Sequence, residues 1–153
     1  MNRWRPHVTV AAVVERDGRF LLVEEEVDEG LRLNQPAGHL EPGESLLEAV
    51  VRETREETAR DFRPRHVVGL YLWPVPDGDR TYLRIVFSGE VGPADRGQTL
   101  DQGILRTLWV PADDIGRLER DGRLRSPLVR RCIQDHLAGR RYPLEICQSL
   151  LPA

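Results

Sequence analysis

The sequence predicts an α/β protein of the α+β kind, in which a mixed β-sheet lies between α-helices. Short β-branched runs bounded by Asp-Gly turns alternate with longer segments of helical periodicity, and the expected element order is ββ(β)αββ(β)αα. A chain of 153 residues is long enough to bury one substantial core and short for two. We therefore expect a single domain over residues 1–153, with its core at about 6–145.

The N-terminal part is predicted to form strands. The β-branched run His7–Val14 stops at Asp17-Gly18, a pair suited to a hairpin turn, and FLLVEEE follows as the second strand of the expected hairpin. A short strand at Leu31–Asn34 must end near Pro36, because proline cannot donate a hydrogen bond to a β-ladder.

A helix is predicted over about Leu46–Arg60. Ser45, with Glu48 three residues later, fits the capping box that opens many helices. At about 100° per residue, apolar side chains and threonines form one stripe, and three glutamates share the adjacent arc. These glutamates are Glu53, Glu56 and Glu57. One flank of the helix thus faces a core, and the other concentrates negative charge.

The C-terminal half is predicted to hold three strands and two helices. HVVGLYLW and YLRIVFSGEV are strands joined by a turn that contains Asp77-Gly78, and ILRTLWV is a further strand. PADDIGRLER begins a short helix with Pro111 near its first turn. SPLVRRCIQDHLAG is a helix opened by Ser126 and Pro127 and closed by Gly139.

Composition narrows the possible partners. All 22 basic residues are arginine, which excludes any mechanism that needs a lysine, and the net charge of -3 argues against a nucleic acid polymer as partner. No apolar run approaches the roughly 20 residues of a membrane span, and none resembles a signal peptide. Two cysteines without CxxC spacing are expected to be reduced thiols. We expect a cytoplasmic protein with no membrane partner, as a monomer or a dimer.

The acidic flank of the long helix needs a physical explanation, because like charges at helical spacing repel. A solvated acidic face, partly neutralised by Arg52 and Arg55, is the ordinary explanation. However, the acids cluster beside the core stripe, carboxylate oxygens suit Mg²⁺ or Mn²⁺, and Gly38 upstream lets the backbone approach a ligand and lend a carbonyl. This chemistry predicts a divalent-metal hydrolase that acts on a small phosphorylated molecule.

Residues 38–60 resemble the Nudix box. The residues that fall on the box pattern at the correct spacing are Gly38, Glu44, Arg52, Glu53, Glu56 and Glu57. The sequence departs from the family at Thr54 and Arg60, where the family has apolar residues, and at Ala59, where it has glycine. These departures bear on packing and on the exit from the helix.

The resemblance extends from about Pro6 to Glu145 and is to the NudJ type of Nudix phosphatase. PHVTVAAVV, FLLVEE, NQPAGHLE, LRSPLV and GRRYPLE carry it outside the box. It implies the Nudix fold and a Mg²⁺-dependent phosphatase that releases orthophosphate from nucleoside di- and triphosphates and from the pyrimidine diphosphate of the thiamine pathway (HMP-PP). Two alternatives stay open: a nucleotide pyrophosphohydrolase, which releases pyrophosphate, and a catalytically inactive nucleotide-binding module.

The resemblance also implies roles for the box residues. Glu53, Glu56 and Glu57 would hold Mg²⁺, or Mn²⁺ in its place, together with the Gly38 carbonyl. Arg52 would orient the glutamates, and Glu53 or Glu56 would accept the proton of the attacking water. Glu44 is expected to support the loop and the helix rather than to touch substrate.

Four further residues are candidates outside the helix. Asp101 is the nearest carboxylate to a further family acid, whose expected place is occupied by Gly103, and plain loop surface is the alternative for Asp101. Arg84 in mid-strand points either into the cleft toward phosphate or outward. Trp73 stacks on a base or packs in the core, and the strand-end position favours the core. Gln35, beside the box, is a candidate substrate contact.

Overall fold

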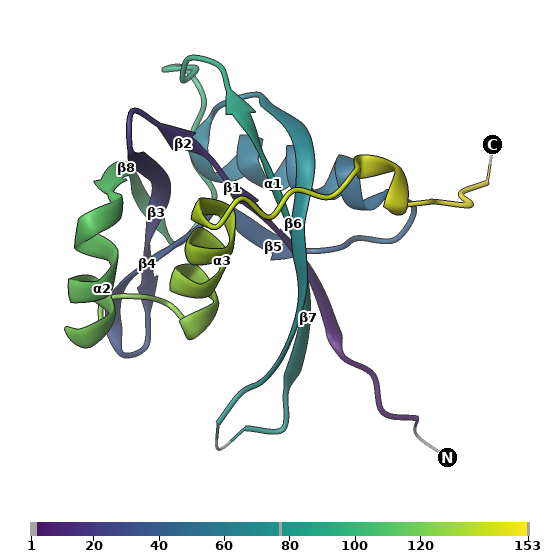
Figure 1. Cartoon of the computed structure of the whole chain (residues 1–153), viewed down its shortest axis with the longest axis horizontal. Helices are drawn as coiled ribbons and strands as arrows, with labels where there is room; N and C mark the ends of the chain where they lie inside the picture. The colour runs from purple at the N-terminus through teal and green to yellow at the C-terminus, as the bar shows by residue number, and fades with distance from the viewer. Residues whose placement is uncertain (1–2, 77, 153) are drawn as a thin grey trace.

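The computed structural model describes residues 3–76 and 78–152, which form strands, helices and one 3-10 turn (Figure 1). In chain order the elements are β1 (His7–Val13), β2 (Glu15–Arg16), β3 (Arg19–Val27), β4 (Gly30–Asn34), β5 (Ala37–His39), α1 (Leu46–Thr58), β6 (Phe62–Pro74), β7 (Thr81–Val91), β8 (Ile104–Pro111), α2 (Ala112–Arg120), α3 (Pro127–Leu137) and η1 (Leu144–Ile146). The predicted α+β class is confirmed.

The first sheet is mixed and has the strand order β5-β1-β7-β6. β1 runs parallel to β7, with Val10 opposite Ile85, and antiparallel to β5, with Val10 opposite Gly38. β6 and β7 form a long antiparallel hairpin that extends beyond the body of the molecule, at the bottom of Figure 1. The parallel β1–β7 pair places the Gly38 segment in the same sheet as strands from the middle of the chain.

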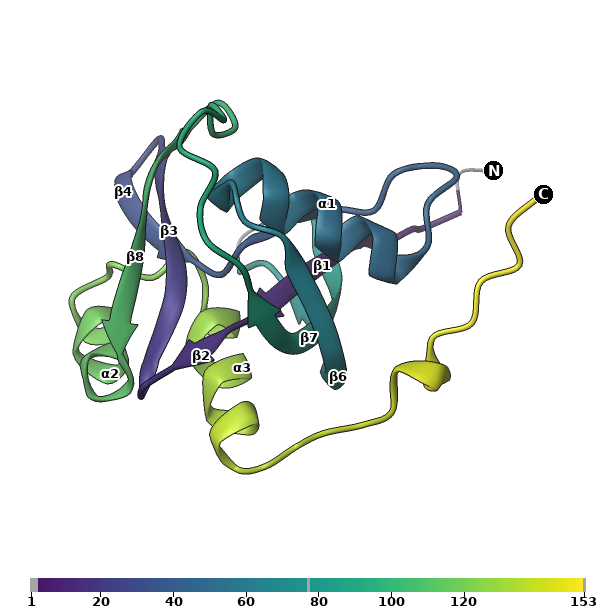
Figure 2. The same ribbon diagram turned by 90° about the horizontal axis from the view of Figure 1, so that it is seen from above.

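Helices cover both faces of this mixed sheet, as predicted. Figure 2 shows α1 on one side of β1 and α3 on the other. Successive side chains of a strand point to opposite faces, so Val10 packs in the core with Val50 of α1, whereas Ala11 packs in the core with Ile133 of α3. The sheet therefore holds α1 against its buried central strand.

The second sheet is antiparallel and is built on β3. It has the order β2-β3-β4, and β8 pairs with β3 on the other side, with Leu22 opposite Leu108. α2 packs against β8 and α3. The loop between β7 and β8 thus leads from the mixed sheet to the antiparallel one, and it passes the C-terminal end of α1, where the backbone N–H of Asp101 donates to the Glu56 carbonyl (3.0 Å).

The predicted opening hairpin is only partly correct. Asp17 and Gly18 form its turn with positive φ angles of 51° and 73°, but only the two residues of β2 pair with β3. β1 leaves this hairpin and joins the mixed sheet. The physical reason is that residues 9–13 of β1 are buried, and a strand buried on both faces gains most from partners on both edges.

One short strand is additional to the prediction, and one strand begins earlier than predicted. β4 ends at Asn34 as expected, but a short strand that the sequence did not indicate, β5, follows Pro36 and pairs with β1. β6 begins at Phe62, ahead of the predicted start at His66, and includes Pro64. Proline is tolerated there because β6 is an edge strand with a register shift beside it.

The other elements lie close to their predicted ranges. α1 has the predicted capping box and ends at Thr58, two residues before the predicted end, because Ala59 adopts a left-handed conformation with φ 55°. α3 begins after the Ser126 cap as predicted. Asp77 of the predicted Asp77-Gly78 turn lies outside the described residues. Within the described residues, 3–76 and 78–152, no helix is both long and apolar enough to cross a bilayer.

Candidate active site

Residues 35–44 lead from β4 to α1, and hydrogen bonds fix both ends of this segment. The Ala12 N–H donates to the Pro36 carbonyl (2.9 Å). At the start of α1, Ser45 Oγ accepts from the Glu48 N–H (3.1 Å), and the Glu48 carboxylate accepts from the Ser45 N–H (2.7 Å). Because the loop and the helix are each tied down, their side chains meet in a defined register.

Arg52 of α1 donates hydrogen bonds to three carboxylates and one carbonyl. Its Nε and Nη2 donate to the two oxygens of Glu44 (2.8 and 2.6 Å). Nη1 donates to Glu53 (2.8 Å) and Glu56 (3.2 Å), and Nη2 also donates to the His39 carbonyl (3.0 Å). The bond from Arg52 holds the pKa of Glu44 below its ordinary value. One guanidinium therefore partly neutralises and orients the acidic flank.

The carboxylate of Glu53 lies directly against Gly38. A Cβ atom at residue 38 would overlap the Glu53 carboxyl group, so this approach requires glycine. Glu53 is only 8% exposed, and burial raises the pKa of its carboxyl group above the ordinary value despite the bond from Arg52. The cost of holding a charged carboxylate away from water is a reason to expect a ligand that pairs with the charge.

Glu57 lies on the next position of the same flank and is more deeply buried. Its Oε2 accepts a hydrogen bond from the Ala37 N–H (3.0 Å), and burial raises the pKa of Glu57 to about 9. A carboxylate with so little solvent is stabilised mainly by opposite charge. Glu57 thus connects α1 to β5 from the side of the helix that faces the sheet.

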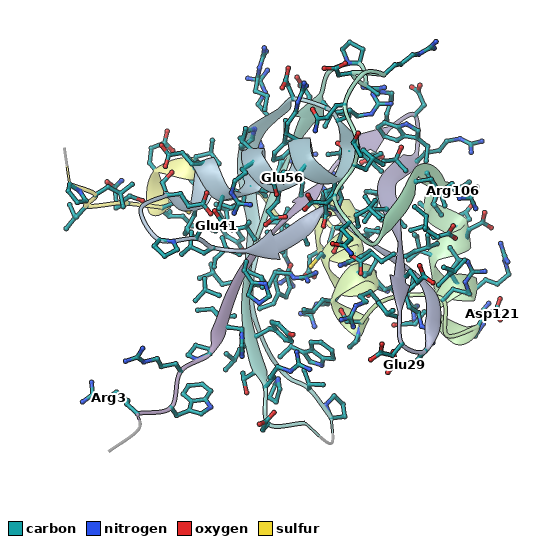
Figure 3. All side chains as sticks on the ribbon, turned by 180° about the vertical axis from the view of Figure 1, so that it is seen from behind. Arg3, Glu29, Glu41, Glu56, Arg106 and Asp121 are labelled. Atoms are coloured by element: carbon teal, nitrogen blue, oxygen red, sulfur yellow. The ribbon has the colours of Figure 1, made fainter. Side chains whose placement is uncertain are left out.

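Asp101 joins the glutamates from the loop between β7 and β8. One oxygen each of Glu53, Glu56 and Asp101 lie within 4.8 Å of one another. The loop is anchored to α1 by the Asp101 backbone bond to Glu56 and by the Gln98 side chain, which donates to the Arg55 carbonyl (2.7 Å). Figure 3 shows Glu56 on α1.

These donors fit a hard divalent cation, because convergent carboxylate oxygens are the ligands that Mg²⁺ and Mn²⁺ prefer. The structure brings Glu53, Glu56 and Asp101 together. Glu57 is not part of this group of three; its carboxylate accepts a hydrogen bond from the Ala37 N–H. Gly38 lies in contact with Glu53. Sequence reasoning could not place Asp101, because its distance from α1 depends on how the loop closes.

A cavity of about 170 Å³ lies beside Gly38. Arg84, which sequence left between a cleft-facing and an outward orientation, lines this cavity and is 8% exposed. Burial lowers the pKa of its guanidinium. The predicted substrate contact Gln35 lies behind it: Gln35 is 1% exposed, donates to the Val129 carbonyl (3.1 Å) and accepts from Arg84 Nη1 (3.5 Å). Gln35 therefore supports Arg84.

Three buried polar atoms of the cavity wall have no hydrogen-bond partner within the described part of the chain. They are Thr9 Oγ1, Asn34 Oδ1 and Arg84 Nε. Sequence reasoning missed Thr9 and Asn34, because Thr9 belongs to a β-branched run and Asn34 precedes a proline-containing turn. The sequence signal that could have indicated Thr9 was the presence of a polar side chain inside an otherwise apolar strand. Buried polar groups without partners are rare in folded proteins, and all three belong to residues that line this cavity.

Trp73 stands at the edge of the same cavity. Its ring stacks on Tyr82, with centroids 6.0 Å apart and planes at 19°. Core packing, which the sequence favours for Trp73, is wrong: the side chain is half-buried and lines the cavity, because this part of the β6–β7 hairpin projects past the helices. An aromatic pair at a cavity edge can stack on a flat ring.

A larger groove of about 680 Å³ lies on the far side of Trp73, between β6 and α3. Three of its polar side chains are already paired with one another: Tyr71 Oη donates to Asp135 (2.8 Å), and Arg131 Nε donates to the same carboxylate (3.1 Å). It is also not lined by the clustered acids. The smaller cavity beside Gly38 is therefore the better candidate for substrate.

The fold and the acidic site define the class of protein. The family model for the NUDIX domain matches residues 4–132, and the chain belongs to this family. It is a Nudix hydrolase, an enzyme that acts on phosphoanhydride bonds. The family that residues 38–60 indicated by their resemblance to the Nudix box is thereby confirmed.

Matches to individual proteins are more informative than the family model. The chain is 42% identical over 143 residues to proteins named phosphatase NudJ from Escherichia coli strain K12 and Shigella boydii, and the match covers 94% of this chain and 91% of each relative. Its structure is similar to that of a Nudix hydrolase from Nitrosomonas europaea, with a TM-score of 0.89, 48% identity and coverage of 95% and 97% of the two chains. A MutT Nudix hydrolase from Burkholderia pseudomallei, at 18% identity and a TM-score of 0.73 over 86% and 98% of the chains, shares the fold.

Proposed function

We propose that this protein is a Mg²⁺-dependent phosphatase that releases orthophosphate from nucleoside di- and triphosphates and from HMP-PP. The observation that carries the proposal is the convergence of Glu53, Glu56 and Asp101 within 4.8 Å, beside a cavity that contains a buried arginine. The name phosphatase carried by relatives that match along 94% of the chain supports the terminal phosphate as the one attacked.

The acidic flank is the metal site in this proposal. Glu53, Glu56 and Glu57 would hold the ion with the Gly38 carbonyl, and Asp101 would complete the set from the β7–β8 loop. When bound, Mg²⁺, or Mn²⁺ in its place, neutralises phosphate oxygens and lowers the pKa of water.

The protein's own groups position the reaction. Arg52 fixes the rotamers of Glu53 and Glu56 through Nη1, and either of these two carboxylates accepts the proton of the attacking water. Glu44 keeps Arg52 in place by a bidentate bond. Arg84, on the other side of Gly38, presents positive charge to the substrate.

Product analysis tests the phosphatase assignment. Nucleoside di- and triphosphates and HMP-PP are incubated with enzyme and Mg²⁺, and orthophosphate and pyrophosphate are measured separately. Orthophosphate as the first product supports the proposal. Pyrophosphate as the sole product from a nucleoside triphosphate would instead establish the pyrophosphohydrolase, which uses the same box but turns another phosphorus toward the water.

A catalytically inactive binding module is the remaining alternative. Glu57→Gln removes a carboxylate that could bind the metal ion while it preserves the shape of the side chain. The proposal expects Glu57→Gln to lose phosphate release by roughly 10²-fold or more. Equal and negligible release by wild type and variant across the whole panel would favour the inactive module.

A further inference from the structure

The C-terminal end of α1 is the surface on which the β7–β8 loop docks. The helix stops at Thr58, because Ala59 adopts the left-handed conformation, and the last carbonyls of a helix need partners from outside it. Three carbonyls at this end accept hydrogen bonds from the loop, those of Arg55, Glu56 and Ala59. The helix that carries the acidic flank therefore also receives the loop that carries Asp101.

The first contact of the loop with α1 constrains Asp101 only weakly. The Asp95 carboxylate pairs with Arg55 Nη2 (3.0 Å), but the two side chains are 52% and 35% exposed. Exposed ion pairs contribute little, because water screens the charges and two long side chains lose freedom. The Asp95 N–H also donates to the Ala59 carbonyl (2.8 Å), at a point well before Asp101 in the chain. The position of Asp101 is therefore left to contacts further along the loop.

Gln98 bonds the middle of the loop to α1. Its side chain is half-buried, whereas the residues on either side of it are exposed. Its Nε2 donates to the Arg55 carbonyl (2.7 Å), and the neighbouring carbonyl of α1, that of Glu56, accepts from the Asp101 N–H (3.0 Å). Two bonds to consecutive carbonyls fix both the position and the direction of the segment that carries the Asp101 carboxylate.

These bonds act against electrostatic repulsion. One oxygen each of Asp101, Glu53 and Glu56 lie within 4.8 Å of one another, and like charges at this distance repel. Asp101 is exposed, so repulsion without a cation favours movement of the loop toward solvent. The bonds from the Gln98 amide and the Asp101 N–H oppose this movement, and neither bond involves a cation. The carboxylate is thus held beside the glutamates by the protein itself.

We propose that Gln98 is a positioning residue, which holds Asp101 in place for the divalent cation. A ligand group that is already ordered loses less freedom when the ion binds, so binding is tighter. Residues that orient the groups around a metal commonly matter in this way without touching it. This inference rests on the proposed function, because it requires that the acids beside Gly38 hold the cation.

A double-mutant cycle with Mn²⁺ alone tests the inference. Gln98→Met keeps the length of the side chain and removes the donor, and Asp101→Asn removes the carboxylate that is positioned. Calorimetry on the full chain without substrate measures Mn²⁺ affinity. Gln98→Met is expected to weaken binding roughly 10-fold. In the Asp101→Asn background the same substitution should change affinity less than about 2-fold, because two residues that act through one group are not additive.

Two further variants complete the design. Gln102→Met, in the same loop and exposed, is the matched control and should bind Mn²⁺ as wild type does. Gln98→Asn keeps the amide but shortens its reach by one carbon, so it is also expected to weaken binding, and it replaces Gln98→Met if that protein does not fold. The Tm without metal shows which variants are folded.

The outcomes separate this inference from the proposed function. Wild-type Mn²⁺ affinity in a folded Gln98 variant would overturn the inference, and so would wild-type affinity in Asp101→Asn. An equal loss of affinity in both backgrounds would also overturn it, because Gln98 would then act on the fold rather than through Asp101. Failure to hydrolyse any phosphorylated compound would count against the phosphatase alone, since the Mn²⁺ series needs no substrate.

Discussion

Arg52 is the residue through which the acidic cluster is organised. It supplies both bonds to Glu44 and reaches Glu53 and Glu56 with a third nitrogen. A planar guanidinium can satisfy several carboxylates at fixed angles, whereas the ammonium of lysine is a point charge on a flexible stem. The charge alone is therefore not sufficient for this role.

Arg52→Lys is predicted to lower kcat by roughly 10- to 100-fold, because the charge remains but the glutamates lose their common orientation. Arg55→Lys is the matched control on the same helix, since the Arg55 guanidinium pairs with Asp61 and Asp95 at the surface. Steady-state assays with Mg²⁺ measure both variants. A kcat for Arg52→Lys equal to that of Arg55→Lys would remove Arg52 from the mechanism.

The two cysteines differ in environment, and this gives a prediction about pH. Cys132 has no exposed surface, and burial raises the pKa of its thiol to about 12. A raised pKa favours the protonated form, so at pH 8 only about one part in 10⁴ is thiolate. Native Cys132 is expected to resist iodoacetamide at pH 8, while the partly exposed Cys147 reacts first.

Peptide mass spectrometry after timed alkylation checks the order of reaction. Both cysteines should react at similar rates in guanidinium chloride, which removes the difference in burial. Native labelling of Cys132 as fast as that of Cys147 would contradict the packing described here.

The elements around the site are defined by their ends. α1 starts at the predicted capping box and stops at Ala59, whose positive φ ends the helix where the family has glycine. The Ala59 carbonyl then accepts from the Asp95 N–H (2.8 Å), which secures the start of the β7–β8 loop. Thr54, another departure from the family pattern, is fully buried, and its Oγ1 donates to the Val50 carbonyl (2.8 Å). Both departures are accommodated without moving the carboxylates.

Ala59→Gly is predicted to stabilise the protein by about 0.5 kcal/mol, because relief of the left-handed strain exceeds the added entropy of the unfolded chain. Ala138→Gly, at the C-cap of α3 with φ -73°, should instead destabilise by a similar amount. Urea unfolding monitored by circular dichroism compares the two. Destabilisation by both substitutions would show that Ala59 carries no strain.

At the scale of the whole molecule, the site lies where the two sheets meet. Glu53 and Glu56 are on α1, which packs on the mixed sheet, and Asp101 is in the loop that enters the antiparallel sheet through β8. A cation held by all three would link elements that belong to different sheets. Ligand binding to the native state alone also stabilises that state.

Saturating Mn²⁺ is predicted to raise Tm by about 5 to 10 °C, from roughly 2.7 kcal/mol of linkage at 100 times Kd. Asp101→Asn should reduce this rise by at least half without lowering the metal-free Tm, because it removes one acid from a repelling group. Asp113→Asn, in the exposed first turn of α2, is the control. Thermal scans with Mn²⁺ and with EDTA measure the shift, and an undiminished rise in Asp101→Asn would exclude Asp101 from the metal site.

The sequence by itself determined the α+β class, the position and cap of α1, and the grouping of Glu53, Glu56 and Glu57 on one flank, because these follow from local periodicity and capping chemistry. Tertiary structure alone decided that β1 leaves its hairpin, that Asp101 meets α1, and that Thr9, Asn34 and Arg84 share a cavity wall. Those outcomes depend on contacts between residues distant in the chain, and local propensity carries no information about which strands pair or how a loop closes.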